Sequence, residues 1–309
     1  MPLLIRGARQ LLTLRGAAGP RLGSALLDLG IIPDGALLID NGRIEHVGVT
    51  RRLERLASAR DAEVIDAAGR VVMPAFIDPV TRPLPGPSSA SGLSPAAGYS
   101  TQRLKTEARR WLAEFARHGT ATAGAGYSAN LDAGAARKAL RALRELDGDP
   151  VRVVPRVHLR QPLDNAAAPE VPAVVLQPGF ASVSGVRVLI PGEAYTGACP
   201  YPPAREWIDR GDAVALATGF DRRESPVAAM PIALSLARTQ MRMTAEEAIA
   251  AATINAAHAL GLAATVGSLE TGKEADIAIL HAADYREVSW ILGWNPVAAL
   301  LRGGKPVKR

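Results

Sequence analysis

The order in which strand and helix patterns follow one another limits the possible folds of this chain more than any other feature. The middle of the 309-residue sequence alternates apolar strands with amphipathic helices, whereas both ends contain only short strands and turns. Alternating strands and helices favour a parallel sheet with helices packed outside it. The sequence therefore predicts an α/β protein with a separate β-rich unit contributed by both ends of the chain.

Four segments near the ends have the pattern strand, turn, strand. The clearest is residues 35–48, GALLIDNGRIEHVG, because an Asn-Gly pair between apolar runs is a strong signal for a tight hairpin. The same pattern is predicted at residues 62–78, 267–280 and 296–309.

The middle of the chain is predicted to be shorter than a full barrel. Helical periodicity covers residues 101–119, 133–149, 202–212 and 243–261, the last opening with a capping box. Six strands are expected between Val71 and Gly267, at 71–78, 120–126, 151–157, 172–179, 185–192 and 213–220. That interval has 197 residues, whereas an eight-stranded (β/α) barrel takes about 250. One or two strand–helix units are therefore expected to be missing.

Composition excludes several classes of protein. The net charge is +6, but only 4% of residues are aromatic and the basic residues are scattered, so we expect no nucleic-acid partner. No run approaches the roughly 18 apolar residues of a spanning helix, so no membrane partner is expected. The single Cys199 allows no internal disulfide, and the first residues lack the pattern of a signal peptide. These features predict a cytoplasmic protein.

Several stretches carry a family resemblance. They are VVMPAFIDPVTRP (71–83), HGTATAGAGYSANLDAGAARKALRAL (118–143), YPPAREWIDRGDAVALATGFDRRESP (201–226), MTAEEAIAAATINAAHALGLAATVGSLETGKEADIAIL (243–280) and GWNPVAALLRGGKPV (293–307). Together they resemble the amidohydrolase superfamily, in particular its imidazolonepropionase branch, which hydrolyses a cyclic amide C–N bond in histidine degradation. The resemblance implies a shortened or incomplete (β/α) TIM-like barrel at residues 71–266. It also implies a small β-sandwich domain made of residues 1–70 and 267–309.

The sequence departs from the family where the chemistry should be. The resemblance implies one divalent metal held by a His-x-His pair, two further histidines and an aspartate. The His-x-His positions carry Val80 and Arg82, and the aspartate position carries Gly219. Val has no lone pair, Arg repels a cation and Gly has no side chain. Only His158, or Arg160 in a looser alignment, falls near another ligand position. No metal is therefore predicted, and zinc or iron is expected only if the family mechanism survives.

The substituted positions suggest a different use of the site. A buried Arg82 would need a carboxylate partner, and Asp78, Asp221 and Glu224 are candidates. The alternatives are a solvated loop, an internal ion-pair plug or an anion-binding site. Tyr127, which matches a substrate-contacting tyrosine of the family, is a further weak candidate for the pocket, as are Arg82, Asp221 and Arg222.

These observations leave three functional hypotheses. The first is a non-catalytic pseudoenzyme or partner subunit, present as a homodimer or in a complex with a full-length amidohydrolase. The second is a divergent, metal-independent enzyme or ligand-binding protein. The third is an active amidohydrolase acting on carbon–nitrogen bonds other than peptide bonds. For the first hypothesis, the contact surface is expected around residues 160–184, with Val174 and Leu176 exposed on it.

Overall fold

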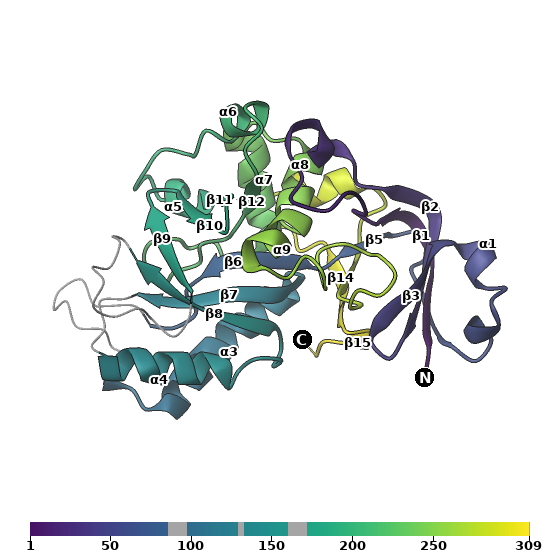
Figure 1. Ribbon diagram of the computed structural model, residues 1–309, viewed down its shortest axis with the longest axis horizontal. Helices are drawn as coiled ribbons and strands as arrows, with labels where there is room; N and C mark the ends of the chain where they lie inside the picture. Colours follow the sequence, from purple (N-terminus) through teal and green to yellow (C-terminus); the bar gives the residue numbers. More distant parts are fainter. Residues whose placement is uncertain (86–97, 129–132, 160–171, 309) are drawn as a thin grey trace.

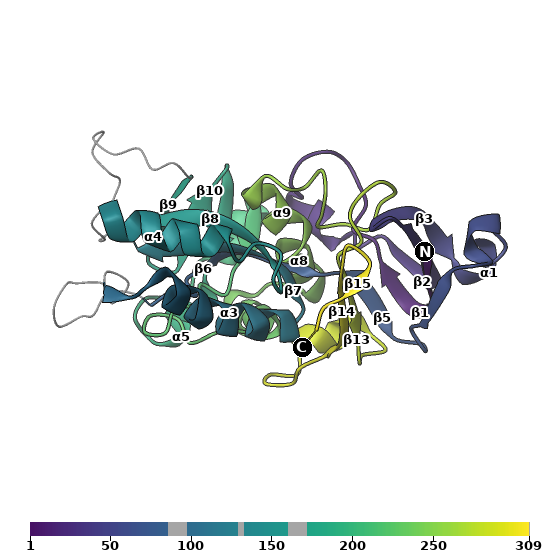
Figure 2. The same cartoon turned by 90° about the horizontal axis from the view of Figure 1, so that it is seen from below.

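The protein consists of two sheets, one built from the chain ends and one forming a barrel with helices outside it (Figure 1). The computed structural model describes residues 1–85, 98–128, 133–159 and 172–308. In Figures 1 and 2 the purple N-terminal and yellow C-terminal strands lie together at one end of the molecule. The predicted α/β class, with a shortened barrel and a separate unit from both chain ends, is confirmed.

The chain-end sheet has eight strands. They are β1 (Leu3–Leu12), β2 (Ile31–Asp40), β3 (Arg43–Val49), β4 (Glu63–Asp66), β5 (Val71–Pro74), β13 (Ile277–Leu280), β14 (Val297–Arg302) and β15 (Lys305–Pro306). Their order is β15-β14-β13-β5-β1-β2-β3, with β4 pairing on β1. Asn41 and Gly42 both have positive φ in the turn between β2 and β3, as the Asn-Gly signal predicts. The hairpin predicted at 296–309 is also present, as β14 and β15.

Two of the predicted hairpins are wrong. In residues 62–78, β4 and β5 do not pair with each other, because both run parallel to β1 and occupy successive parts of its length. In residues 267–280, only Ile277–Leu280 is a strand, and the residues before it contribute an isolated bridge between Glu274 and Arg43. A turn signal between apolar runs does not fix which strands become partners.

The chain passes from one sheet to the other within a single short stretch. β5 pairs with β1 and β13 in the chain-end sheet, and the barrel sheet begins two residues later at Phe76. The stretch expected to be the first barrel strand is therefore divided between the two sheets. The domain limits given above, 1–70 with 267–309 against 71–266, remain a prediction.

Within the described residues the barrel sheet has seven strands, one more than predicted. They are β6 (Phe76–Thr81), β7 (Thr120–Ser128), β8 (Arg152–Leu159), β9 (Ala173–Gln177), β10 (Phe180–Val183), β11 (Val186–Leu189) and β12 (Val214–Leu216). The strand that sequence reasoning missed is β10, four residues between two turns. It pairs antiparallel with both β9 and β11, whereas the other pairings in this sheet are parallel. The expectation of an all-parallel sheet is therefore wrong at this point.

The first and last strands of the barrel sheet approach each other beyond their paired regions. Gly219 N–H donates to the carbonyl of Val80 at 3.0 Å, and Arg82 N–H donates to the carbonyl of Phe220 at 2.7 Å. These two bonds join the end of β6 to the segment that follows β12. The shortened sheet thus comes close to closing on seven strands.

Most of the helices lie outside the barrel sheet or between it and the chain-end sheet, whereas α1 packs on β2 and β3 at the far end of the chain-end sheet. The helices are α1 (Thr50–Leu53), α3 (Thr101–Arg117), α4 (Ala133–Arg144), α5 (Pro191–Tyr195), α6 (Ala204–Asp209), α7 (Met230–Met241), α8 (Ala245–Ala251) and α9 (Ile254–Leu260). Short 3-10 turns occupy Gly23–Leu27, Ala57–Ala59 and Tyr285–Ser289. The capping box of Thr244 and Glu247 is confirmed at the start of α8, but the predicted helix 243–261 is interrupted at Thr253. Within the described residues, no helix is long and apolar enough to span a membrane.

Apolar residues on the two faces of the barrel sheet form separate clusters. Alternate residues of β7 and β8 pack against α3 and α4, which lie side by side in Figures 1 and 2. Residues from β6, β9, β10, β11, β12 and α9 form a second cluster on the other face. Val174 and Leu176 belong to this second cluster and are almost fully buried. The prediction that they form an exposed contact surface is therefore wrong. Residues 160–171 of that predicted surface lie outside the described part of the chain.

Candidate functional site

The candidate site lies where the barrel sheet closes, at the end of β6 and just after β11 and β12. This is the end of the strands at which (β/α) barrels carry their functional residues. Arg82 directly follows β6, Glu193 lies in α5 after β11, and Asp221 lies five residues after β12. Although they are far apart in the sequence, their side chains meet.

The centre of the site is the guanidinium group of Arg82. Its Nη2 lies 3.2 Å from Glu193 Oε1, its Nη1 lies 2.8 Å from Glu224 Oε2, and its Nε lies 3.4 Å from Asp221 Oδ2. The Nε contact is an ion pair without the geometry of a hydrogen bond. The side chains of Arg82, Glu193 and Asp221 are 7%, 5% and 12% exposed, whereas Glu224 is 42% exposed. We refer to these four residues as the Arg82 cluster.

The loop after β12 is built so that its carboxylates face Arg82. Asp221 and Ser225 pair through both of their backbone groups, which closes a tight loop. Asp221 Oδ1 also accepts from the N–H groups of Arg223 at 2.9 Å and Glu224 at 3.2 Å. Such bonds from an aspartate to the following backbone are typical of tight turns. Asp221 thus both shapes the loop and leaves Oδ2 for Arg82.

Glu193 is the member of the cluster that sequence reasoning missed. Its Oε2 accepts from the backbone N–H of Gly179 at 3.1 Å, in the turn between β9 and β10, while Oε1 faces Arg82. It therefore connects the missed strand to the closure of the barrel. A sequence signal existed, because Glu193 follows directly after a predicted strand ending in an apolar run.

Asp78 lies beside the cluster but is not one of its ion-pair partners. Its carboxylate accepts from the backbone N–H of Thr218 at 3.2 Å and from the Thr218 hydroxyl. Complete burial raises the pKa of Asp78 to about 7, against the lowering effect of these hydrogen bonds. Near neutral pH Asp78 is therefore only partly ionised and contributes less than a full negative charge to the site.

His158, the one candidate metal ligand, is buried on β8 with its ring over Gly126. Neither ring nitrogen has a hydrogen-bond partner in the described structure. Burial, together with the positive charges of Arg82 and Arg156, lowers the pKa of His158 to about 3. The imidazole is therefore neutral at physiological pH. Arg156 is itself buried and donates from Nη2 to the carbonyl of Leu260 at 3.3 Å.

Three further predicted site residues, Val80, Tyr127 and Arg222, take no part in the Arg82 cluster. Val80 is fully buried in the apolar cluster of the inner sheet face. Tyr127 is also buried, but it packs in the cluster between the barrel sheet and helices α3 and α4, on the other face. Arg222 points outward and pairs with Glu107 of α3. The structure thus brings Arg82 and Asp221 together, while Tyr127 and Arg222 lie outside the Arg82 cluster.

Gly219, which the resemblance places at a metal-binding aspartate, has little room for a side chain. Its φ is +62°, and a Cβ atom there would lie 2.0 Å from Ile190 Cγ2. Gly185 has a similar φ of +77°, but nothing lies within 4 Å of its Cβ position. Comparing substitutions at these two glycines therefore separates the cost of left-handed backbone from the cost of steric overlap.

We expect Gly219→Ala to destabilise the protein clearly more than Gly185→Ala. Left-handed backbone should cost about 1–2 kcal/mol at either position. Overlap with Ile190 should add about 1–3 kcal/mol at residue 219 only. Urea unfolding of both variants measures the difference. Equal losses of unfolding free energy would mean that Ile190 moves aside easily and that an aspartate could be accommodated.

The residues present do not fit a divalent metal. Within the described residues, no group of three or more His, Cys, Asp or Glu side chains is arranged to hold one. At the positions that the resemblance assigns to metal ligands, the structure has an apolar side chain, a guanidinium group engaged with carboxylates, and a glycine without space for a side chain. An arginine already supplies the positive charge that these carboxylates face.

The fold defines the class of protein. E. coli guanine deaminase has a similar structure, with a TM-score of 0.76 at 13% identity over 100% of this chain and 99% of that chain. An adenosine deaminase from Xanthomonas campestris with bound zinc gives 0.70 at 16% identity, covering 98% and 92%. The model of the amidohydrolase family also matches residues 201–307. The barrel with its chain-end sheet is therefore an amidohydrolase fold.

Sequence relatives identify the branch. The imidazolonepropionase of Solibacter usitatus (strain Ellin6076) is 33% identical, with 97% of both chains covered. That of Geobacillus kaustophilus (strain HTA426) is 31% identical, with 99% of this chain and 98% of the relative covered. The chain belongs to the imidazolonepropionase family. The first alignment is 409 positions long, so at least 100 positions of the relative have no counterpart among the 309 residues here.

Proposed function

We propose that this chain is a non-hydrolytic member of the imidazolonepropionase family. The observation that carries the proposal is the Arg82 cluster, in which one guanidinium group faces three carboxylates at the catalytic end of the barrel. Hydrolysis by the family mechanism needs about three metal-binding side chains and an open position for water. Val80, Arg82 and Gly219 provide none of these ligands.

The surroundings of the cluster support a structural role for it. Arg82 connects β6 to α5 through Glu193 and to the loop after β12 through Asp221. Glu193 extends the connection to the turn before β10. The inner sheet face beside the cluster is filled by apolar side chains from four further strands and α9. The cluster thus stabilises the closure of a barrel that has only seven strands.

A partner-subunit role follows from this proposal. We propose that the chain acts as a homodimer or in a complex with a full-length amidohydrolase. Such a role needs a stable fold but no hydrolytic activity. The buried surface around Val174 and Leu176 is not available for that contact.

A second candidate function is binding or conversion of a small ligand without a metal. It is favoured by the buried polar atoms near the site that have no partner in the described structure, namely both ring nitrogens of His158 and Nε of Arg156. Buried polar atoms normally have hydrogen-bond partners, and a ligand could supply them. An active hydrolase of other carbon–nitrogen bonds is a third candidate, since the family is defined by that chemistry.

The proposal is tested on purified protein, with a full-length imidazolonepropionase as the positive control. After incubation with zinc and desalting, we expect clearly less than one metal ion per chain and no hydrolysis of imidazolonepropionate above buffer. Stoichiometric zinc that is lost on His158→Ala would contradict the proposal and favour a hydrolase. A rise in melting temperature with a small-molecule library would instead favour the second candidate, because a ligand of the folded state stabilises it.

Association is measured on the same preparation. Analytical ultracentrifugation at micromolar concentration, alone and mixed with the full-length relative, should show a dimer or a mixed complex. A monomer under both conditions would rule out the partner-subunit role.

A further inference from the structure

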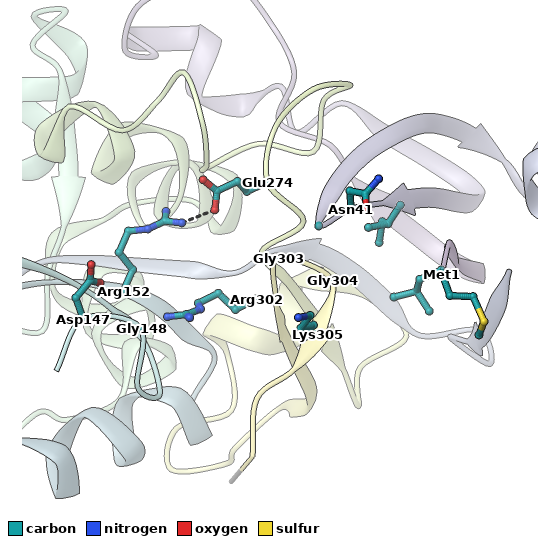
Figure 3. A pocket seen from close by; sticks show the side chains of 13 residues that line it. Met1, Asn41, Asp147, Gly148, Arg152, Glu274, Arg302, Gly303, Gly304 and Lys305 are labelled. Atoms are coloured by element: carbon teal, nitrogen blue, oxygen red, sulfur yellow. Dashed lines mark hydrogen bonds and ion pairs between the residues drawn. The ribbon is translucent and has the colours of Figure 1, made fainter. Parts of the chain in front are cut away.

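A second site lies at the opposite end of the barrel from the Arg82 cluster. A cleft of about 710 Å³ opens between the start of β8 and the chain-end sheet (Figure 3). Asp147, Gly148 and Arg152 line it from the barrel side, and Glu274 with residues 302–305 from the sheet side. Its volume is within the range of small-molecule sites, about 300–1,000 Å³.

The β14–β15 hairpin contributes two basic residues to this cleft. Gly303 and Gly304 both have positive φ, which makes a two-residue turn, and Arg302 is paired directly with Lys305 in the strand register. Like charges directly opposite each other in an antiparallel pair are destabilising. Neither side chain has a hydrogen bond or an ion pair within the described part of the chain. The hairpin therefore carries two positive charges that form no ion pair within the described residues.

The acidic residues around the cleft are already engaged. Glu274 pairs with Arg152, and Asp147 Oδ1 accepts from the N–H of Val153 at 2.9 Å. Asp276, behind the cleft, accepts from the N–H of Gly303 at 2.8 Å. Burial raises the pKa of Asp276, although Arg152 and Arg302 oppose this effect. Of these carboxylates, Asp276 interacts electrostatically with Arg302, but it forms no ion pair with Arg302 or Lys305.

The side chain of Arg302 extends across the cleft toward the barrel side. Figure 3 shows its side chain extending from the hairpin toward Gly148 and Asp147. The guanidinium Nη2 lies 3.3 Å from where a Cβ on Gly148 would be, so the absence of a side chain there permits the approach. Arg302 thus faces the barrel side of the cleft, while Lys305 lines the cleft on the hairpin side.

We propose that this cleft binds a small molecule through a phosphate group, with Arg302 and Lys305 as its two cationic contacts. A phosphate suits the pair because a guanidinium fork binds two of its oxygens while an ammonium group acts as a point charge on another. Its negative charge also complements the two cations of the hairpin, which form no ion pair within the described residues. The site is separate from the Arg82 cluster and does not depend on whether the protein hydrolyses anything.

Calorimetric titration with pyrophosphate and inorganic phosphate at constant ionic strength tests the proposal. We expect saturable binding by the wild-type protein. Arg302→Gln and Lys305→Gln should each weaken it about tenfold or more, since each removes a charge-assisted hydrogen bond. The affinity of Arg302→Lys should lie between those of wild type and Arg302→Gln, because lysine keeps the charge but lacks the forked guanidinium group. Arg51→Gln, which removes an exposed cation on α1 outside the cleft, is the matched control and should bind like wild type.

Several outcomes would overturn the proposal. One is binding that does not saturate up to about 10 mM ligand, because a dissociation constant above this value is too weak for a specific site. Another is equal weakening by Arg51→Gln, which would indicate a general charge effect. Citrate binding as tightly as pyrophosphate would exclude selectivity for phosphate. The unliganded variants give an independent check, because Lys305→Gln relieves repulsion and should not lower the unfolding midpoint. A lower midpoint would show that the cation pair is already balanced by the protein.

Discussion

Replacing Arg82 with methionine is expected to lower the free energy of unfolding by about 3–5 kcal/mol, the usual result of removing one partner from a buried ion pair. The loss arises chiefly at Glu193, whose carboxylate is 5% exposed and would keep only the N–H of Gly179. Asp221 would retain its bonds from the backbone of residues 223 and 224. Urea unfolding monitored by circular dichroism measures the change.

Two further variants separate the charge effect from lost packing. Glu224→Gln removes the exposed partner of Arg82, and we expect a loss below about 1 kcal/mol. Arg82→Met combined with Glu193→Gln should recover much of the stability, because it leaves no unpaired charge buried. If Arg82→Met alone costs no more than Glu224→Gln, the cluster does not hold the barrel closed and the structural role proposed for it is wrong.

The parts of the fold that sequence reasoning predicted correctly depend on local signals. The hairpins at Asn41-Gly42 and Gly303-Gly304 follow from turns that only such residues make easily. The missed elements lack a local signal. β10 is four residues long, and α7 is buried on most of its circumference, so it has no polar face to reveal its period. The parallel pairing of β4 and β5 on β1 depends on contacts distant in sequence.

The candidate site was partly predictable for a physical reason. A buried arginine needs carboxylates, and the sequence supplied Asp221 and Glu224 at the right strand end. Glu193 was not predicted, since the strand before it is positioned by its pairing with both β12 and the missed β10. The same gap explains why Val174 and Leu176 were expected on the surface. With β10 present, their side chains face the protein's own apolar cluster.

Two buried groups near the cluster should make stability depend on pH in opposite directions. The pKa of Asp78 is raised from 3.8 to about 7 by burial, so the folded state keeps a proton that the unfolded state loses. The stabilisation that this provides is present at low pH and is lost as the pH rises from about 4 to about 7. The pKa of His158 is lowered from 6.5 to about 3, so between these pH values the unfolded state binds a proton that the folded state does not bind. Its contribution is present above about pH 6.5 and is lost as the pH falls.

We expect these two effects nearly to cancel in the wild-type protein and to appear when either group is removed. Between about pH 7.5 and pH 5, each is worth about 2 kcal/mol at 1.4 kcal/mol per pH unit. Asp78→Asn should therefore lose stability on acidification relative to wild type, because His158 is left unopposed. His158→Leu should gain stability over the same interval, because Asp78 is left unopposed. Unfolding free energies of the three proteins, measured with urea across this range, give the slopes directly.

The test is the sign of the pH slope of unfolding free energy for Asp78→Asn and for His158→Leu, each relative to wild type. These signs do not depend on how stable each variant is at any one pH. His46→Gln, at a half-exposed histidine on β3, is the control and should follow the wild-type profile. Parallel profiles for wild type, Asp78→Asn and His158→Leu would mean that both groups titrate alike in the folded and unfolded states. The site would then be open to water in solution, and the sealed, structural role of the Arg82 cluster would be untenable. Slopes of opposite sign would instead show that the closed end of this barrel excludes water from both groups, as the structural role proposed for the Arg82 cluster requires.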